Sequence, residues 1–263
     1  MEVWRTIWNK SQTKRLGLSW GLRRQASRCS RGGCLESKES SLLHPSVSRC
    51  QPPYSSHRCH QLTGPPHSPP SFSAILLAAG ESTRMGRQKA LLPWRGTSLI
   101  QYQIQALLDA GVSDVVVVVG YRAETLRPLV ERFSDAKTAL NLRYRTGRSS
   151  SIRAGLRNID QRAQDIMVLG VDQPRSAETV RRVMELHRRL GSVITYPAYR
   201  GKGGHPIIFS RALLPELMRI KESRQGLREV VERHRAEVVR LEVEDTEVVL
   251  DLNRPDEYQQ AVE

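Results

Sequence analysis

Residues 73–263 of this 263-residue chain contain no cysteine, and no stretch approaches the eighteen or so consecutive apolar residues of a membrane-spanning helix. Without cysteine this segment owes nothing to disulfide bonds, which fits a reducing compartment, and we expect a cytoplasmic protein. Without a long apolar run the chain has no transmembrane helix and no expected membrane partner. The length fits one large α/β domain or two small ones.

Acidic residues are scarce in residues 1–72, which hold 11 Lys and Arg but only 3 Asp and Glu. Residues 73–263 hold the other 30 basic and 24 acidic residues, so they carry only +6 of the total net charge of +14. This modest excess, with no recognised nucleic-acid-binding module, argues against nucleic acid as a partner.

The first 72 residues also lack sustained periodicity and are rich in Pro, Ser and His, as in the run 64–70. We expect a low-complexity basic extension that is disordered or wrongly extended, with an organellar transit segment as the alternative. Its cysteines lack the Cys-x-x-Cys pairs of zinc sites, so metal binding is not expected there. These cysteines are Cys29, Cys34, Cys50 and Cys59.

From residue 73 onwards apolar runs and helical periodicity alternate. Unbroken apolar runs such as 114–119 are typical of strands buried on both faces of a parallel sheet, so the alternation predicts an α/β, doubly wound, mostly parallel sheet. Ligands of such sheets bind at the carboxyl ends of the strands. The predicted strands are 73–79, 114–119, 165–171, 192–197, 206–209, 237–243 and 248–250, and the predicted helices are 98–110, 123–133, 150–159, 177–190, 211–220 and 227–233.

The loop after the first predicted strand, 77–89, combines glycines with three cations. Glycine lets backbone N–H groups approach phosphate oxygens, and Arg and Lys supply charge, so the loop suits a polyphosphate. It is neither a Walker A loop nor a Gly-x-Gly-x-x-Gly dinucleotide motif. The alternative is an ordinary turn with solvated cations.

The same loop, Leu-Ala-Ala-Gly-x-Ser-x-Arg-Met-Gly-x-x-Lys over 77–89 followed by Leu-Leu-Pro at 91–93, resembles the signature of the nucleotidyltransferases with a Rossmann-like fold. Within them it resembles the branch of the molybdenum-cofactor cytidylyltransferases. Matching stretches follow in order at 147–156, 172–174, 204–206 and 251–255, and the resemblance covers about 73–262. It implies a nucleotidyltransferase domain at 73–263 that uses Mg²⁺ to transfer CMP from CTP, or a nucleotide from another triphosphate, to a molybdopterin-type acceptor.

The resemblance also assigns roles to individual residues. We expect Leu77, Ala78, Ala79, Gly80, Gly86, Gly147 and Ser151 to bind the nucleotide, Arg84, Lys89 and Asp172 to act in catalysis, His205 and Arg153 to bind the acceptor, and Asp172 and Asp251 to hold the metal.

Some of these positions can also be interpreted from the residues alone. Asp172 follows an apolar strand, so its carboxylate lies at the carboxyl end of the sheet, where a metal bridging phosphates needs oxygen ligands. The alternative is a carboxylate that stabilises a helix N-terminus. Asp251 follows the predicted strand 248–250, with Asn253 as a competing ligand, and the choice stays open. His205 is either an acceptor-binding or proton-transfer residue or an ordinary loop residue.

The remaining candidates have structural alternatives too. The serines of the 147–155 segment can simply cap a helix, and the Arg153 side of that helix can be a solvated face.

Two positions depart from the pattern of the family. Arg254 stands where relatives usually have Thr, and Arg175 stands where an apolar or hydroxyl residue is more usual. These departures leave the acceptor open, with a sugar phosphate or another phosphorylated metabolite as the chemical alternative. A non-catalytic partner that delivers cofactor to a molybdenum hydroxylase is the alternative from another class.

Overall fold

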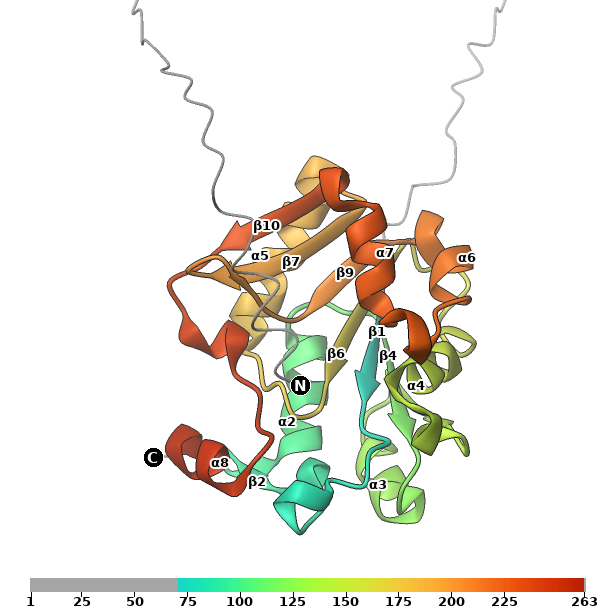
Figure 1. The fold of residues 1–263 in the computed structure, drawn as a ribbon. Coiled ribbons are helices and arrows are strands. Elements are labelled where there is room, and N and C mark those ends of the chain that lie inside the picture. The colour runs from blue at the N-terminus through green and yellow to red at the C-terminus, as the bar shows by residue number, and fades with distance from the viewer. Residues whose placement is uncertain (1–70, 263) are drawn as a thin grey trace, which may run out of the picture. The chain divides into compact units, whose positions relative to one another are not determined.

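The apolar runs of the sequence form a mostly parallel sheet in the computed structural model, which describes residues 71–262 (Figure 1). Its strands are β1 (Phe72–Leu77), β4 (Asp114–Val119), β5 (Ala136–Leu140), β6 (Asp165–Gly170), β7 (Ile194–Tyr199), β8 (Lys202–Gly203), β9 (Ile207–Ser210) and β10 (Val238–Glu242). The order across the sheet is β10-β7-β9-β6-β1-β4-β5, with β8 paired to β7. Only β9 and β8 run antiparallel to their neighbours.

Helices cover both faces of this sheet, so the predicted doubly wound α/β class is confirmed (Figure 1). One face packs against α2 (Leu99–Asp109), α3 (Ala123–Val130) and α5 (Ala177–Leu190), and the other packs against α4 (Arg148–Leu156), α6 (Leu214–Leu217) and α7 (Leu227–Arg233). Because side chains of a strand alternate in direction, Ala74 and Leu76 of β1 join the first layer and Ile75 joins the second.

Local signals fix several element ends where the sequence predicts them. The strand at 114–119 and the helix at 177–190 have the predicted bounds. The hydroxyl of Ser176 accepts a hydrogen bond from the Thr179 N–H, which caps the start of α5, and Gly191 ends the helix in the left-handed conformation at φ 57°.

The C-terminal part differs most from the prediction. The strand predicted at 248–250 is wrong: residues Thr246–Val249 form a 3-10 helix, and backbone carbonyls there pair with the Arg175 guanidinium instead of a neighbouring strand. The helix predicted at 211–220 is only a 3-10 turn followed by the short α6.

Other elements were not predicted at all. They include the edge strand β5, the short strand β8, the hairpin of β2 (Pro93–Trp94) and β3 (Thr97–Ser98), and α8 (Pro255–Val262), whose Tyr258 hydroxyl donates to the Pro93 carbonyl.

The prediction of a low-complexity extension concerns residues 1–72. Of these, only residues 71 and 72 belong to the described part of the chain. Phe72 already belongs to β1 and pairs with Asp165, so the sheet begins one residue before the predicted domain boundary. Within residues 71–262 no helix is both long and apolar enough to cross a bilayer.

Gly155 lets α4 lie directly on β1, and this close packing generates a prediction. A Cβ at this position would lie 2.5 Å from Ile75 Cγ2 and 3.1 Å from Val118 Cγ2. Gly155→Ala should therefore lower the free energy of unfolding by about 1–2 kcal/mol, because overpacking outweighs the gain in helix propensity. Urea denaturation measures the change. Gly80→Ala, whose Cβ meets nothing within 4 Å, is the control, and equal stability of the two variants would contradict the packing argument.

Candidate active site

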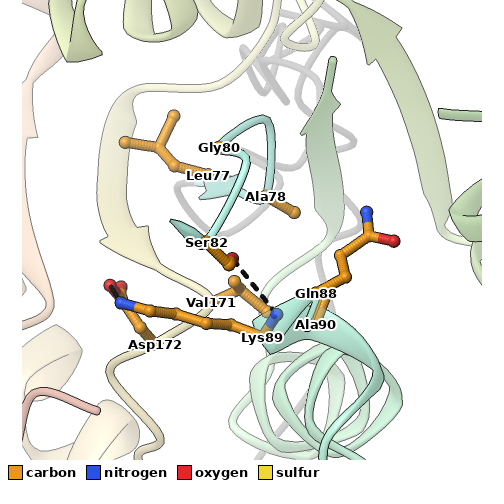
Figure 2. Close-up of a pocket in the computed structure, with 9 residues that line it drawn as sticks. All are labelled: Leu77, Ala78, Gly80, Ser82, Gln88, Lys89, Ala90, Val171 and Asp172. Atoms are coloured by element: carbon orange, nitrogen blue, oxygen red, sulfur yellow. Dashed lines mark hydrogen bonds and ion pairs between the residues drawn. The ribbon is translucent and has the colours of Figure 1, made fainter. Parts of the chain in front are cut away.

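The glycine loop between β1 and α2 forms one wall of a cavity of about 130 Å³ (Figure 2). Ser82 and Gly86 take left-handed conformations, at φ 54° and 67°, on either side of the 3-10 turn Thr83–Met85. The Lys89 N–H donates to Ser82 Oγ at 3.2 Å, which closes the loop on itself. The cavity is lined by Leu77, Ala78, Gly80, Ser82, Gln88, Lys89, Ala90, Val171 and Asp172.

One lining atom has no partner within the described residues. Gln88 Nε2 donates to the Tyr121 carbonyl at 3.1 Å, whereas the buried Gln88 Oε1 accepts no hydrogen bond. An acceptor of this kind, buried beside the cavity, can be satisfied by a hydroxyl or amino group of a ligand.

Lys89 connects the glycine loop to two other segments. Its Nζ lies 2.9 Å from Asp172 Oδ2 and 3.0 Å from Asn253 Oδ1, and Figure 2 shows the side chain extended towards Asp172. Asp251, in contrast, has Oδ1 2.7 Å from Gln173 Nε2. The structure therefore brings Asn253, and not Asp251, to the cation that Asp172 faces.

The Asp172 and Asn253 oxygens fit a hard divalent cation. Carboxylate and amide oxygens are the protein ligands that Mg²⁺ takes, and the Lys89 ammonium shows that both oxygens can face one positive charge. Within residues 71–262 no three Asp, Glu, His or Cys residues are grouped to hold a metal. A bound Mg²⁺ would thus need phosphate and water oxygens to complete its coordination, as is usual for this ion.

The turn that carries Asp172 is held by a buried amide from α2. Gln103 Nε2 donates to the Gln173 carbonyl at 2.5 Å and to the Gly170 carbonyl at 3.3 Å, while Gln103 Oε1 accepts from the Arg175 N–H. This residue is not among those expected from the sequence. Its signal is a glutamine on an otherwise apolar helix face, where it is 1% exposed.

Arg175, only 1% exposed, ties the turn to the C-terminal segment. Its guanidinium donates to the carbonyls of Pro174, His205, Val248 and Leu250 at 2.7–3.1 Å. Burial lowers the pKa of Arg175 to about 10, opposed chiefly by the charge of Asp251, so the group stays protonated at neutral pH. Arg175, which departs from the family pattern, therefore has a structural role: its hydrogen bonds set the path of the chain towards Asn253.

The loop with His205 approaches the same segment closely. A Cβ on Gly204 would lie 2.0 Å from the Val248 carbonyl oxygen, and the His205 N–H donates to that oxygen at 3.1 Å. Only glycine fits at position 204 without moving the backbone. His205 Nδ1 lies 3.0 Å from Gln173 Nε2, which links the loop to the Asp172 turn.

The N-terminus of α4 carries the residues predicted to meet the base. Gly147, at φ 111°, precedes the helix, and a Cβ there would lie 2.6 Å from the Glu222 side chain. Glu222 Oε2 accepts from the Ser149 N–H at 2.8 Å, and the buried Ser151 Oγ accepts from Asn141 Nδ2 at 3.0 Å. A distant carboxylate thus takes part of the capping role that the serines were expected to have.

Arg153 is tied away from the cavity. Its guanidinium donates to the Ile220 carbonyl, so it joins α4 to the turn before α7. The glycine loop contacts the segment just before α4 through Glu81. Its Oε1 accepts hydrogen bonds from the Tyr144 hydroxyl at 3.0 Å and from Arg145 Nε at 2.7 Å. The hydrogen bond from Arg145 is the main cause that lowers the pKa of Glu81.

The predicted site residues thus fall into two groups. Those that line the cavity are Leu77, Ala78, Gly80, Lys89 and Asp172. Those outside its lining are Ala79, Arg84, Gly86, Gly147, Ser151, Arg153, His205 and Asp251.

The comparisons with known proteins agree with the family resemblance of the sequence motifs. Residues 74–238 match the MobA-like NTP transferase domain. The chain is 26% identical to the molybdenum cofactor cytidylyltransferase of Escherichia coli (strain K12) over 191 residues, which are 72% of this chain and 94% of that protein. It is 34% identical to the nicotine blue oxidoreductase of Paenarthrobacter nicotinovorans over 160 residues, 56% of this chain and 74% of that protein.

Solved structures show the same similarity. Rv0371c from Mycobacterium tuberculosis H37Rv aligns with a TM-score of 0.64 and 26% identity, over 74% of this chain and 99% of that chain. Its complex with manganese aligns with a TM-score of 0.60 and 27% identity, over 73% of this chain and 98% of that chain. A related structure therefore holds a divalent metal ion.

The ties made by Arg175 generate a stability prediction. Arg175→Met removes the donors of four carbonyls, and the free energy of unfolding should fall by about 3–5 kcal/mol, because the buried acceptors lose their partners. Arg175→Lys keeps the charge but not the fork of donors, so it should recover only part of this loss. Denaturation in guanidinium chloride measures both. The exposed Arg254→Met is the control, and a loss below about 1 kcal/mol for Arg175→Met would contradict the role.

Proposed function

This chain belongs to the MobA-like NTP transferase family, as its motifs predicted, and we propose that it is a Mg²⁺-dependent nucleotidyltransferase acting on a phosphorylated acceptor. The observation that carries the proposal is the convergence of Lys89, Asp172 and Asn253 beside the cavity of the glycine loop. A cation and two oxygen ligands at such a loop are the groups that a nucleoside triphosphate and its metal require. In this proposal residues 73–263 are the catalytic domain.

The residues of the chain have separate tasks in this reaction. The N–H groups of the glycine loop would bind the phosphates, and the Asp172 and Asn253 oxygens would hold Mg²⁺, which when bound supplies charge neutralisation for the triphosphate. Lys89 would exchange its contact with Asp172 for one with the departing pyrophosphate. The exposed Arg84 and Gly86 of the same loop would face the phosphates from the solvent side.

The transfer itself needs no side-chain nucleophile. An oxygen of the acceptor phosphate forms the new bond to the α-phosphorus, the bond from the α-phosphorus to its bridging oxygen breaks, and pyrophosphate leaves with the electron pair. Positioning and charge stabilisation supply the rate acceleration in such reactions. A site that consists of backbone N–H groups, a lysine and two metal ligands meets this requirement.

For the substrates we propose CTP and a molybdopterin-type acceptor, which would give the cytosine dinucleotide form of the cofactor. Support comes from the motifs and from the name of the E. coli relative. A molybdenum hydroxylase that receives the product would then be a partner. Since the P. nicotinovorans relative is named an oxidoreductase, family membership alone does not determine the reaction.

An assay of pyrophosphate release from each triphosphate with Mg²⁺ distinguishes an enzyme from a delivery protein. Varying the acceptor in the same assay tests a sugar phosphate as the alternative substrate.

Asp172 is the central residue for the metal role. Asp172→Asn keeps the volume but removes the charge, and kcat should fall by at least about 100-fold at saturating Mg²⁺, since losing the negative charge that would hold the metal costs several kcal/mol in the transition state. Pyrophosphate release measures the rate. The exposed Asp256→Asn is the control and should keep wild-type kcat. If Asp172→Asn retains more than about a tenth of the activity, the metal role is wrong.

The base preference gives a second prediction for this function. Ala79 is 5% exposed and belongs to the apolar layer of α4, on the side of Gly147 and Ser151, so its methyl group limits the space on the side proposed for the base. Guanine is larger than cytosine, and its amino group needs a partner in a closed site, so kcat/KM for CTP should exceed that for GTP by about tenfold or more. Ala79→Gly should narrow this ratio. Equal efficiencies in the wild-type protein would reject the cytidylyl assignment and leave nucleotidyl transfer standing.

A further inference from the structure

The side chain of Gln173 joins three parts of the site. Gln173 Oε1 accepts from the Gly170 N–H at 2.8 Å, while Gln173 Nε2 lies 2.7 Å from Asp251 Oδ1 and 3.0 Å from His205 Nδ1. Because the Gly170 N–H can only donate, the atom facing it must be the amide oxygen. The orientation of the amide is thereby fixed, and its two N–H groups are directed at Asp251 and His205.

This orientation determines where the His205 ring carries its proton. Nδ1 faces a donor and must accept, so in the neutral ring the proton is on Nε2. Burial, and then the charges of Arg148 and Arg175, keep the pKa of His205 well below its ordinary value, so the ring is neutral at physiological pH. No residue in the described part of the chain accepts a hydrogen bond from Nε2, and His205 as a residue is only partly buried.

We propose that His205 donates a hydrogen bond from Nε2–H to a phosphoryl oxygen of the acceptor substrate, and that Gln173 is the positioning residue that holds His205 in this tautomer. The proposal rests on the proposed function, because it deepens the role of the same site. Arg148, the exposed first residue of α4, is close enough for its charge to act on His205, so an anion bound at Nε2 would be stabilised by a cation as well.

The same geometry argues against proton transfer at His205. A base would need a free ring nitrogen, but Nδ1 is occupied by Gln173 and Nε2 already carries the proton. The reaction also makes little demand for a base, since a phosphomonoester near neutral pH is mostly a dianion. Of the two roles that the sequence left open, the hydrogen bonds therefore favour binding of the acceptor.

The tautomer can be measured without any turnover. In protein with ¹⁵N-labelled histidine, long-range ¹H–¹⁵N correlation spectra should show the His205 proton on Nε2. The Gln173→Glu/Asp251→Asn double variant keeps an acceptor for the Gly170 N–H and reverses donor and acceptor between positions 173 and 251 without changing the net charge. It presents an acceptor to Nδ1, so a proton should appear on Nδ1. Nδ1–H in the wild-type protein, or an unchanged ring in the double variant, would overturn the role of Gln173.

Inorganic phosphate is the probe for the donor role, with the triphosphate site saturated by Mg²⁺ and α,β-methylene CTP. Phosphate should shift the His205 Nε2–H resonance, and His205→Leu should raise the Kd of phosphate by about tenfold or more. His205→Gln can still offer an N–H near the position of Nε2, so its Kd should rise by less than about threefold. Absence of a shift, or equal losses in the two variants, would overturn the donor role. Both spectra are readable even if no triphosphate releases pyrophosphate, so failure of the proposed function would be seen separately.

Discussion

The guanidinium of Arg175 holds together segments that are distant in sequence but must meet at the site. Its hydrogen bonds to the carbonyls of Pro174, His205, Val248 and Leu250 join the Asp172 turn, the His205 loop and the C-terminal segment. Burying an arginine costs several kcal/mol, and here the cost is offset by carbonyl dipoles and by nearby carboxylates such as Asp251. The resemblance to the family did not lead us to expect a charged residue at this position, so this chain fixes its C-terminal segment through its own set of contacts.

From this tie follows which side-chain oxygens lie at the site proposed for the metal. The C-terminal segment is drawn past Asp172, whose carbonyl accepts from the Leu252 N–H at 2.8 Å, and the next residue, Asn253, faces Lys89. Asp251 lies on the other side of the same short stretch and pairs with Gln173. One segment therefore supplies Asn253, the proposed metal ligand, and Asp251, which accepts a hydrogen bond from the Gln173 amide that faces His205. The side proposed for the triphosphate and the side proposed for the acceptor substrate are thus joined through nearby residues of this segment.

The fold positions the residues of the proposed site, but it does not determine which reaction they carry out. Because Ala78 and Ala79 follow a buried strand, they point to opposite faces of the sheet, and only Ala78 lines the cavity. The proposed phosphate and base regions therefore belong to different layers, joined by the glycine loop through Glu81 and Tyr144. The relatives that this chain resembles include a cytidylyltransferase and a protein named as an oxidoreductase, so the shared fold alone does not indicate one reaction.

The sequence by itself determined the features that depend on neighbouring residues. Apolar runs and helical periodicity were sufficient for β4, α5 and the α/β class, and the strand-glycine pattern located the loop and Asp172 at the carboxyl edge. Only the tertiary structure decided that Asn253 rather than Asp251 meets Lys89, that residues 246–249 form a 3-10 helix, and that Gln103 supports the turn. The physical reason is the range of the contacts. The two residues that accept hydrogen bonds from Lys89 are 83 and 164 residues away from it in the sequence. No local sequence pattern shows whether Asp251 or Asn253 will face Lys89, because the buried Arg175 sets the path of their segment.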